Sequence, residues 1–265
     1  MALVDIRPTV RRRLSLVASI VVFIAVVLAV IFFADWPKII QNFFNWSVIK
    51  KMWPNVILIA LRNTLLYTIG TFVIGLLLAT ALALLKMSKG PLRWFAIVFI
   101  ELFRGMPALL TIIIMVFAVP IAFGWRFPGG TIGGALLALV LVTGAYTAEV
   151  IRAGIEAVPK GQREAARSLG MSNMQTTMSV ILPQAFRIVI PPLTNELVTL
   201  LKDTSLVYIA GATFATKELT LFGKDASSTY ANSSPYVVVA VLYLIVTIPM
   251  TYLVGRLEKK MAVRK

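Results

Sequence analysis

The apolar residues of this chain are gathered into long blocks, each close to the length of about 20 residues with which an α-helix crosses a bilayer. Lipid offers no hydrogen-bond partner to a free backbone group, so blocks of this kind fold as helices. The chain is 59% hydrophobic and 14% charged, whereas soluble domains are about half apolar and a quarter charged. We therefore expect an all-α, multi-pass membrane protein without a separate catalytic domain.

The sequence contains six candidate spans. They cover residues 14–33, 56–85, 95–123, 131–157, 184–212 and 236–257. Pro191 and Pro192 are expected to break the fifth span. The first block is predicted to be an anchor, because it is longer than the core of a signal peptide and its exit at Phe33 lacks a small-residue cleavage pattern. Three tryptophans in residues 34–55 indicate an amphipathic stretch along the outer surface of the membrane. Residues 1–54 would thus form an N-terminal anchor and outer segment, and residues 55–260 the main transmembrane domain.

The distribution of basic residues predicts how the chain is oriented. Its net charge of +15 would suggest a nucleic-acid partner in a soluble protein, but here the basic residues lie in short loops between apolar blocks. Sixteen belong to the loops of one side, namely Arg7, Arg11, Arg12, Arg13, Lys86, Lys89, Arg93, Arg152, Lys160, Arg163, Arg167, Arg256, Lys259, Lys260, Arg264 and Lys265. Six belong to the opposite loops, namely Lys38, Lys50, Lys51, Arg126, Lys217 and Lys224. The positive-inside rule then predicts cytoplasmic termini, with membrane lipid and not nucleic acid as a partner.

The residue inventory excludes several kinds of chemistry. The sequence has no cysteine and no histidine, so disulfides, thiol nucleophiles, imidazole catalysis and the usual zinc sites are ruled out. It has no G-x-x-x-x-G-K-[ST] phosphate-binding loop, and we expect no cofactor in this chain. An ion-coupled secondary transporter is disfavoured by the lack of a visible inverted repeat. An intramembrane enzyme that uses carboxylates is disfavoured by the lack of a nucleophile motif. We predict no catalytic residue and no metal ligand.

Two pairs of opposite charges stand three residues apart on predicted helices, Glu101 with Arg104 and Glu149 with Arg152. This spacing puts both side chains of a pair on one face of a helix. We interpret both as structural ion pairs and not as parts of a transport site.

The most regular pattern between spans lies in residues 157–175, on the side assigned to the cytoplasm. Pro159 suits a first helical turn and Gly170 a left-handed helix end, which predicts a short helix between them. Ser172 and Gln175 have the spacing of a capping box that starts a second helix, and Pro183 is expected to interrupt that helix. These features alone are equally compatible with a surface helix whose basic side lies on lipid headgroups.

The first of these helices has two distinct sides. Lys160, Arg163 and Arg167 recur at helical spacing on one side. A small apolar patch on another side is made by Ala165, Ala166 and Leu169. Small side chains in this patch would let the surface of a partner come close.

The same loop resembles a known family motif. Glu164-Ala165-Ala166, then Gly170, then nine residues and Val180-Ile-Leu-Pro183 follow the E-A-A-x-x-x-G-x9-I-x-L-P pattern of ABC importer permeases, with valine in place of the isoleucine. Further strings resemble the polar amino-acid permeases of histidine, arginine, glutamine and glutamate uptake. These strings are Glu101-Leu-Phe-Arg-Gly-Met-Pro107, Gly144-Ala-Tyr-Thr-Ala-Glu149, Pro159-Lys-Gly-Gln162, Leu182-Pro-Gln-Ala185 and Leu201-Lys-Asp-Thr-Ser-Leu206. The resemblance covers about residues 55–260, and residues 1–54 depart from the shorter members.

The resemblance implies a type I ABC importer permease fold in the bacterial inner membrane. Two permease subunits, identical or homologous, would pair, and two cytoplasmic ATPase subunits that hold ATP and Mg²⁺ would dock on the loop. An extracytoplasmic binding protein would deliver the amino acid. The chain itself would be a transport subunit and not an enzyme. The residues implied for ATPase coupling are Glu164, Ala165, Ala166, Leu169 and Gly170.

Polar residues of the fifth span are the candidates for substrate binding. Glu196 and Asp203 stand seven residues apart, which is two helical turns, and so they share one face. A charge at the centre of a membrane helix costs about 2.5–3.5 kcal/mol, so such residues usually have a partner or face a polar cavity. A zwitterionic amino acid needs an acceptor for its ammonium group and a donor for its carboxylate. The residues predicted to supply both are Glu196, Asp203, Asn195, Thr199 and Lys202. In the alternative, Lys202 and Asp203 form a structural pair and Glu196 faces the partner subunit.

Overall fold

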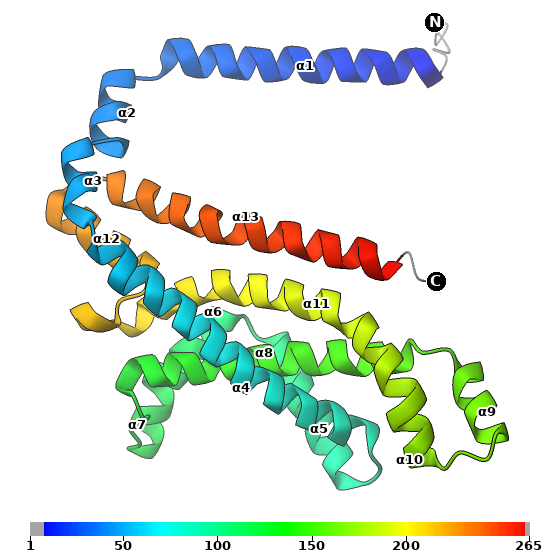
Figure 1. The fold of residues 1–265 in the computed structure, drawn as a ribbon. Helices are drawn as coiled ribbons and strands as arrows, with labels where there is room; N and C mark the ends of the chain where they lie inside the picture. The colour runs from blue at the N-terminus through cyan, green and yellow to red at the C-terminus, as the bar shows by residue number, and fades with distance from the viewer. Residues whose placement is uncertain (1–7, 263–265) are drawn as a thin grey trace, which may run out of the picture.

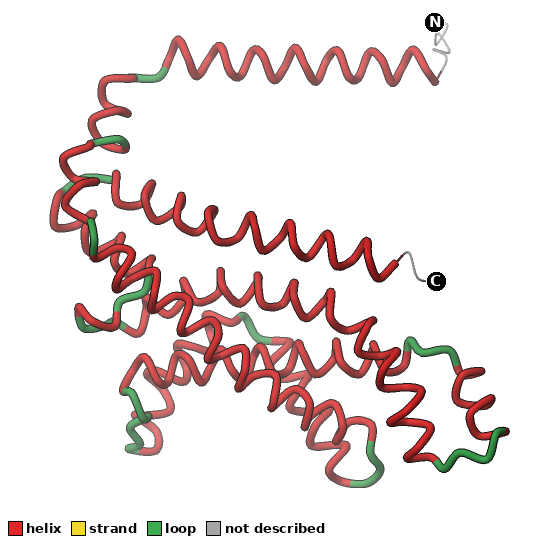
Figure 2. The backbone as a smooth tube through the Cα atoms, viewed as in Figure 1, coloured by secondary structure: helices red, strands yellow, loops and turns green. Residues whose placement is uncertain are grey.

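The computed structural model describes the backbone of residues 8–262 and the side chains of residues 16–261. Every regular element in this part of the chain is a helix (Figures 1 and 2). The elements of the first half are α1 (Pro8–Phe33), α2 (Trp36–Phe43), α3 (Trp46–Met52), η1 (Val56–Leu61), α4 (Arg62–Met87), α5 (Pro91–Gly105), α6 (Ala108–Ile113), η2 (Ile114–Ala118) and α7 (Val119–Phe123). Those of the second half are α8 (Gly130–Glu156), α9 (Lys160–Ser168), α10 (Asn173–Thr176), η3 (Thr177–Ile181), α11 (Leu182–Asp203), η4 (Thr204–Ala210), η5 (Phe214–Thr216), α12 (Leu219–Tyr230) and α13 (Ser234–Ala262). The predicted all-α fold is confirmed for these residues.

Four described helices are long and apolar enough to cross a membrane, at residues 16–33, 56–87, 130–156 and 234–261. A fifth candidate is the pair formed by α5 and residues 108–123, which bends by 106° at the break between its two parts. These five coincide with five of the six predicted blocks. The remaining block, 184–212, forms α11 and η4, and α11 carries charged side chains that include Arg187, Glu196 and Asp203.

Two predicted helix breaks are wrong. α11 runs through Pro191 and Pro192 without interruption. Each proline leaves the carbonyl four residues earlier without its helical donor, here those of Arg187 and Ile188, and a membrane helix tolerates this where neighbouring groups pair with those carbonyls. Pro183 lies in the first turn of α11, directly after the π-helical η3. The missing N–H of a proline does little harm in a first turn, so the chain stays helical there.

The centre of the fold is α8, which packs along α4 on one side and α11 on another. In an apolar stretch of 18 residues of α8, 61% is buried inside the molecule, whereas nothing is buried in the corresponding stretch of α1. Gly144 allows the close approach of α4, because a β-carbon there would lie 2.8 Å from Leu78 Cδ2. α1 stands apart from the other helices (Figure 1). Its apolar side chains are therefore exposed on the outside of the described bundle.

The predicted amphipathic stretch, residues 34–55, forms the short helices α2 and α3. α2 has no buried residue, while Val48 and Met52 of α3 are buried. Met52 belongs to an apolar cluster with residues of η1, α12 and α13. This segment thus fixes the N-terminal part of the chain to one end of the helical bundle.

The loops that the charge count assigns to one side lie together in space. Figure 1 shows the beginning of α1, the turn between α4 and α5, helix α9 and the end of α13 at one end of the molecule. At the opposite end lie α2, α3, α7 and α12. Of the sixteen basic residues, Arg7, Arg11, Arg12, Arg13, Arg264 and Lys265 lie outside the described side chains.

A buried carboxylate organises the end of the fold that carries α12. Glu218 lies outside the candidate spans, is 1% exposed, and caps α12 by accepting hydrogen bonds from the backbone N–H groups of Thr220 and Leu221 at 2.5 and 2.6 Å. Burial raises the pKa of Glu218 to about 7, although these hydrogen bonds act in the opposite direction. The Tyr243 hydroxyl donates a further, longer bond to Glu218 at 3.4 Å, which ties α13 to the start of α12.

Candidate functional site

A pocket of about 300 Å³ lies between α8, α11 and the break that separates α5 from α6. Its lining residues are Met106, Pro107, Ala108, Val142, Thr143, Tyr146, Glu196, Thr199, Leu200 and Asp203. Two carboxylates and three hydroxyl groups line it among otherwise apolar side chains. Such a mixture suits a small polar molecule that carries a positive charge.

Three of the five predicted substrate residues line this pocket, namely Glu196, Thr199 and Asp203. Asn195 and Lys202 are exposed and are not part of its lining. Each of these two precedes a lining carboxylate by one residue, which rotates its side chain by about 100° around the helix axis. Sequence spacing thus identified the face of α11 that lines the pocket, but the predicted set included two residues from the neighbouring face.

The other wall of the pocket was missed by the reasoning from sequence. It consists of Thr143 and Tyr146 on α8 and of Met106 and Pro107 at the end of α5. Tyr146 also donates a hydrogen bond from its hydroxyl to the carbonyl of Arg104 at 3.1 Å. The motif strings around Gly144 and Pro107 were the available signal, but only the folded chain brings both strings opposite α11.

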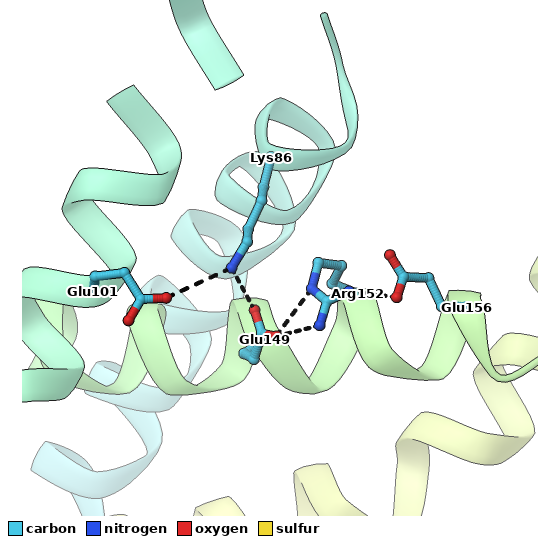
Figure 3. Close-up of polar contacts among 5 residues, drawn as sticks. All are labelled: Lys86, Glu101, Glu149, Arg152 and Glu156. Atoms are coloured by element: carbon cyan, nitrogen blue, oxygen red, sulfur yellow. Dashed lines mark hydrogen bonds and ion pairs between the residues drawn. The ribbon is translucent and has the colours of Figure 1, made fainter. Parts of the chain in front are cut away.

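Ion pairs outside the pocket lining join α4, α5 and α8 (Figure 3). Lys86 Nζ lies 2.9 Å from Glu149 Oε2 and 4.0 Å from Glu101 Oε1. Arg152 pairs with Glu149 and also with Glu156, one turn further along α8. Glu149 is the centre of the cluster because it contacts both cations. No group of three or more acidic side chains is placed to hold a metal ion among the described residues.

The expected pair of Glu149 and Arg152 is confirmed, whereas the expected pair of Glu101 and Arg104 is wrong. Glu101 is instead within 4.0 Å of Lys86 on α4. The Arg104 guanidinium lies over the ring of Tyr146, 5.5 Å from its centroid. Helical spacing permits a pair but does not require it, and here contacts with the neighbouring helices α4 and α8 decide the partners.

The loop between α8 and α11 has the predicted helix–turn–helix form. Gly170 ends α9 with φ +83°, and its N–H donates to the carbonyl of Arg167 at 3.0 Å. The N–H of Met171 donates to the carbonyl of Ala166 at 3.2 Å. These two bonds are the pattern of a Schellman motif, which requires a left-handed residue and so favours glycine. The predicted capping box of Ser172 and Gln175 is present at the start of α10.

The small apolar patch predicted on α9 is divided between two faces. Ala166 is 4% exposed and packs inward, whereas Leu169 is 84% exposed. Ala165 is also exposed. A groove of about 470 Å³ follows α9, and Lys160, Arg163 and Glu164 line one side of it. The side chains that remain accessible to a partner are therefore Glu164, Ala165 and Leu169.

Contacts connect α9 with the helix that carries the pocket carboxylates. Ile181 of η3 and Ala185 of α11 form a buried cluster with Val158, which lies just before α9. The Gln184 amide donates to the Gln162 side chain of α9 at 3.4 Å. Since η3 continues directly into α11, α9 and the residue before it are packed against the start of the helix that carries Glu196.

Comparison with known proteins identifies relatives over most of this architecture. The profile of a family described as "Binding-protein-dependent transport system inner membrane component" matches residues 72–263. The "Probable glutamine ABC transporter permease protein GlnM" of Bacillus subtilis is 39% identical over 192 residues, which cover 72% of this chain and 85% of that protein. The "Arginine transport system permease protein ArtQ" of the same organism is 33% identical over 206 residues, 77% of this chain and 92% of that protein.

Solved structures agree with the observed fold. The structure described as an amino acid ABC transporter with histidines matches with a TM-score of 0.73 and 33% identity, over 82% of this chain and 98% of that chain. An inward-facing structure of the MetNI methionine ABC transporter matches with a TM-score of 0.66 over 80% of this chain and 98% of that chain. At 19% identity the second likeness supports the fold alone.

Proposed function

Because this chain belongs to the family of binding-protein-dependent transport system inner membrane components, we propose that it is the translocation subunit of an ATP-driven importer of polar amino acids. The observation that carries this proposal is the family match over residues 72–263, which includes both the acidic pocket and the loop of α9. The printed names of the relatives, which include glutamine and arginine permeases, support an amino acid as substrate.

In this proposal the amino acid passes through the pocket between α8 and α11. Glu196 and Asp203 would accept hydrogen bonds from its ammonium group, and Thr199 would supply a neutral hydroxyl. Charged side chains in a membrane domain are costly, so two carboxylates on one polar pocket support a transport path better than a purely structural role. The two α-carbons are about 10 Å apart along the helix axis, so one ammonium group would contact the carboxylates in succession.

Coupling to ATP hydrolysis would take place at α9. Cytoplasmic ATPase subunits, which would hold ATP and Mg²⁺, would dock against Glu164, Ala165 and Leu169, while Ala166 and Gly170 keep the helix in position. The exposed Leu169 supports this role, because an apolar side chain that is 84% exposed at a polar helix end suits a partner surface. Closure of the ATPase dimer would move α9, and η3 would transmit this motion to α11. The pocket would then become accessible from the other side of the membrane.

The remaining partners follow from the same proposal. A second permease subunit, identical or homologous, would complete the pore, and an extracytoplasmic binding protein would deliver the amino acid. Both termini and α9 would face the cytoplasm of a bacterial cell. The arrangement of the basic loops at one end of the molecule supports this orientation (Figure 1). Cleavage of a tag at Met1 by a protease added to the periplasmic face would contradict it.

The central experiment is co-purification of this chain with its ATPase and binding protein, followed by reconstitution into liposomes. Uptake and ATPase activity are measured with each of the twenty amino acids. We expect stimulation by a subset of polar amino acids and no uptake without ATP. A flat response to all twenty would contradict the substrate class. Uptake driven by an ion gradient without the ATPase would favour a secondary transporter instead.

A further inference from the structure

The pocket between α8 and α11 has acidic groups on its wall but no cation. Its charged lining residues are Glu196 and Asp203, and its other polar groups are the hydroxyls of Thr143, Tyr146 and Thr199. An amino acid brings a carboxylate as well as an ammonium group. That carboxylate would be repelled by the acidic residues, and repulsion is stronger in a poorly hydrated site than in water. The lining hydroxyls can donate to this carboxylate, but a cation that offsets its charge must come from just beyond the lining residues.

The other cations on the helices around the pocket either form an ion pair with a carboxylate or lie on another helix face. Lys86 and Arg152 both pair with Glu149. Lys202 is exposed on the neighbouring face of α11. Arg104 differs from Lys86 and Arg152, because within the described side chains it forms no ion pair with a carboxylate, and the predicted partner Glu101 lies beside Lys86 instead. It differs from the exposed Lys202 because it is partly buried.

Arg104 is held beside the pocket by Tyr146. The guanidinium carbon lies 5.5 Å from the centroid of the Tyr146 ring, and that ring lines the pocket. The Tyr146 hydroxyl donates to the Arg104 carbonyl at 3.1 Å, so the tyrosine contacts both the backbone and the side chain of this residue. Met106 and Pro107, which follow closely in the chain, line the pocket as well.

The donor capacity of Arg104 is incompletely used. Its Nε is buried and has no hydrogen-bond partner. A buried donor without a partner is destabilising, so such a group is expected to have a role that offsets its cost. A guanidinium presents several N–H groups in a planar fork that matches the two oxygens of a carboxylate.

We propose that Arg104 binds the carboxylate of the translocated amino acid, while Glu196 and Asp203 bind its ammonium group in succession. The inference rests on the function proposed above and adds the group that recognises the acid end of the substrate. Tyr146 positions the guanidinium through its ring, which lies 5.5 Å from the guanidinium carbon, and through its bond to the Arg104 carbonyl. Substrates would then be selected for a free carboxylate within the membrane domain, independently of the binding protein.

The test measures equilibrium binding to the assembled complex of permease and ATPase without binding protein. The probes are L-glutamine, L-arginine and L-histidine, each compared with its carboxamide, which lacks the carboxylate but keeps the ammonium group. Arg104→Gln removes the cation, and Arg104→Lys keeps a charge but loses the planar fork. Arg126→Gln, which changes an exposed arginine of the loop before α8, is the matched control. Assembly of each variant is checked by co-purification with the ATPase.

We expect Arg104→Gln to weaken binding of the free amino acid by about tenfold or more, Arg104→Lys to fall between, and the carboxamides to bind all variants equally. If the variant loses binding of the amino acid and of its carboxamide to the same extent, or loses neither, the assignment of Arg104 is overturned, whereas the pocket itself is not. If Arg104→Gln does not assemble, Arg104→Lys is judged by the same comparison. A wild-type complex whose binding is absent or insensitive to Glu196→Gln would overturn the pocket and Arg104 together.

Discussion

Replacing Glu196 with glutamine removes one negative charge from the pocket wall and keeps the size and shape of the side chain. The variant leaves no cavity, and it removes a charge whose desolvation disfavours the folded chain. Assembly with the partner subunits should therefore be unchanged. Transport should be affected, because a neutral amide is a weaker acceptor for an ammonium group than a carboxylate is.

The expected magnitude follows from the loss of one charge-assisted contact. Hydrogen bonds to charged groups contribute about 1.5–3 kcal/mol, which corresponds to roughly a ten- to hundredfold change in occupancy of the pocket. Asp203 lies two helical turns away on the same face, so it does not replace Glu196 at the same position in the pocket. Asp203→Asn should thus produce a separate loss of similar size.

The assay is ATP-dependent uptake by the reconstituted complex, expressed per assembled complex, with the binding protein saturated. Glu258→Gln is the matched control, because Glu258 is an exposed carboxylate near the end of α13 and outside the pocket. We expect the control to transport as the wild type does. Unchanged uptake kinetics in both Glu196→Gln and Asp203→Asn would show that the substrate does not contact this face of α11, and would refute the reasoning.

Three further predictions concern coupling and stability. Gly170→Asp places a β-carbon at φ +83°, which costs about 1–2 kcal/mol, and should abolish uptake while ATP hydrolysis continues. Gly124→Asp places a β-carbon at another left-handed helix end, with φ +62°, outside the docking loop and should retain uptake. Glu149→Gln leaves two cations without their shared carboxylate and should lower the free energy of unfolding by about 1.5–3 kcal/mol, seen in thermal unfolding of the purified complex; an unchanged melting curve would contradict the role of the cluster. The pKa of Glu218 is raised from 4.5 to about 7, so the folded chain holds this proton more tightly than the unfolded chain. That contribution to stability is present below about pH 4.5 and is lost as the pH rises through about 7; thermal stability should therefore fall more steeply with pH in the wild type than in Glu218→Gln, and parallel curves would contradict this.

The local features of the fold could be predicted because neighbouring residues determine them. Pro159 and Gly170 bound α9 as expected, since a proline suits a first turn and a left-handed helix end favours glycine. The proline pair of α11 was misjudged for a related reason. The cost of a proline depends on whether neighbouring groups pair with the freed carbonyls, and the neighbours are known only in the folded chain, where α11 is continuous.

The candidate sites depend both on residue spacing in the sequence and on packing between helices. A spacing of seven residues put Glu196 and Asp203 on one face, and the pocket lies along that face. The opposite wall of the pocket could not be predicted from the sequence, because residues of α5, α8 and α11 that are far apart in the chain meet only when the helices pack. The same limit applies to Glu101, Lys86 and Arg104, whose partners were decided by contact with neighbouring helices.

The sequence by itself determined that the chain is helical and membrane-embedded, because apolar blocks in lipid leave the backbone no other partner than itself. It also determined the family, through motif strings that do not depend on packing. Only the tertiary structure decided which polar groups share a pocket, which charges pair, and that Arg104 lies beside Tyr146 without a carboxylate. Helical periodicity tells which residues share a face, but the orientation of one face toward another is set by side-chain packing between helices.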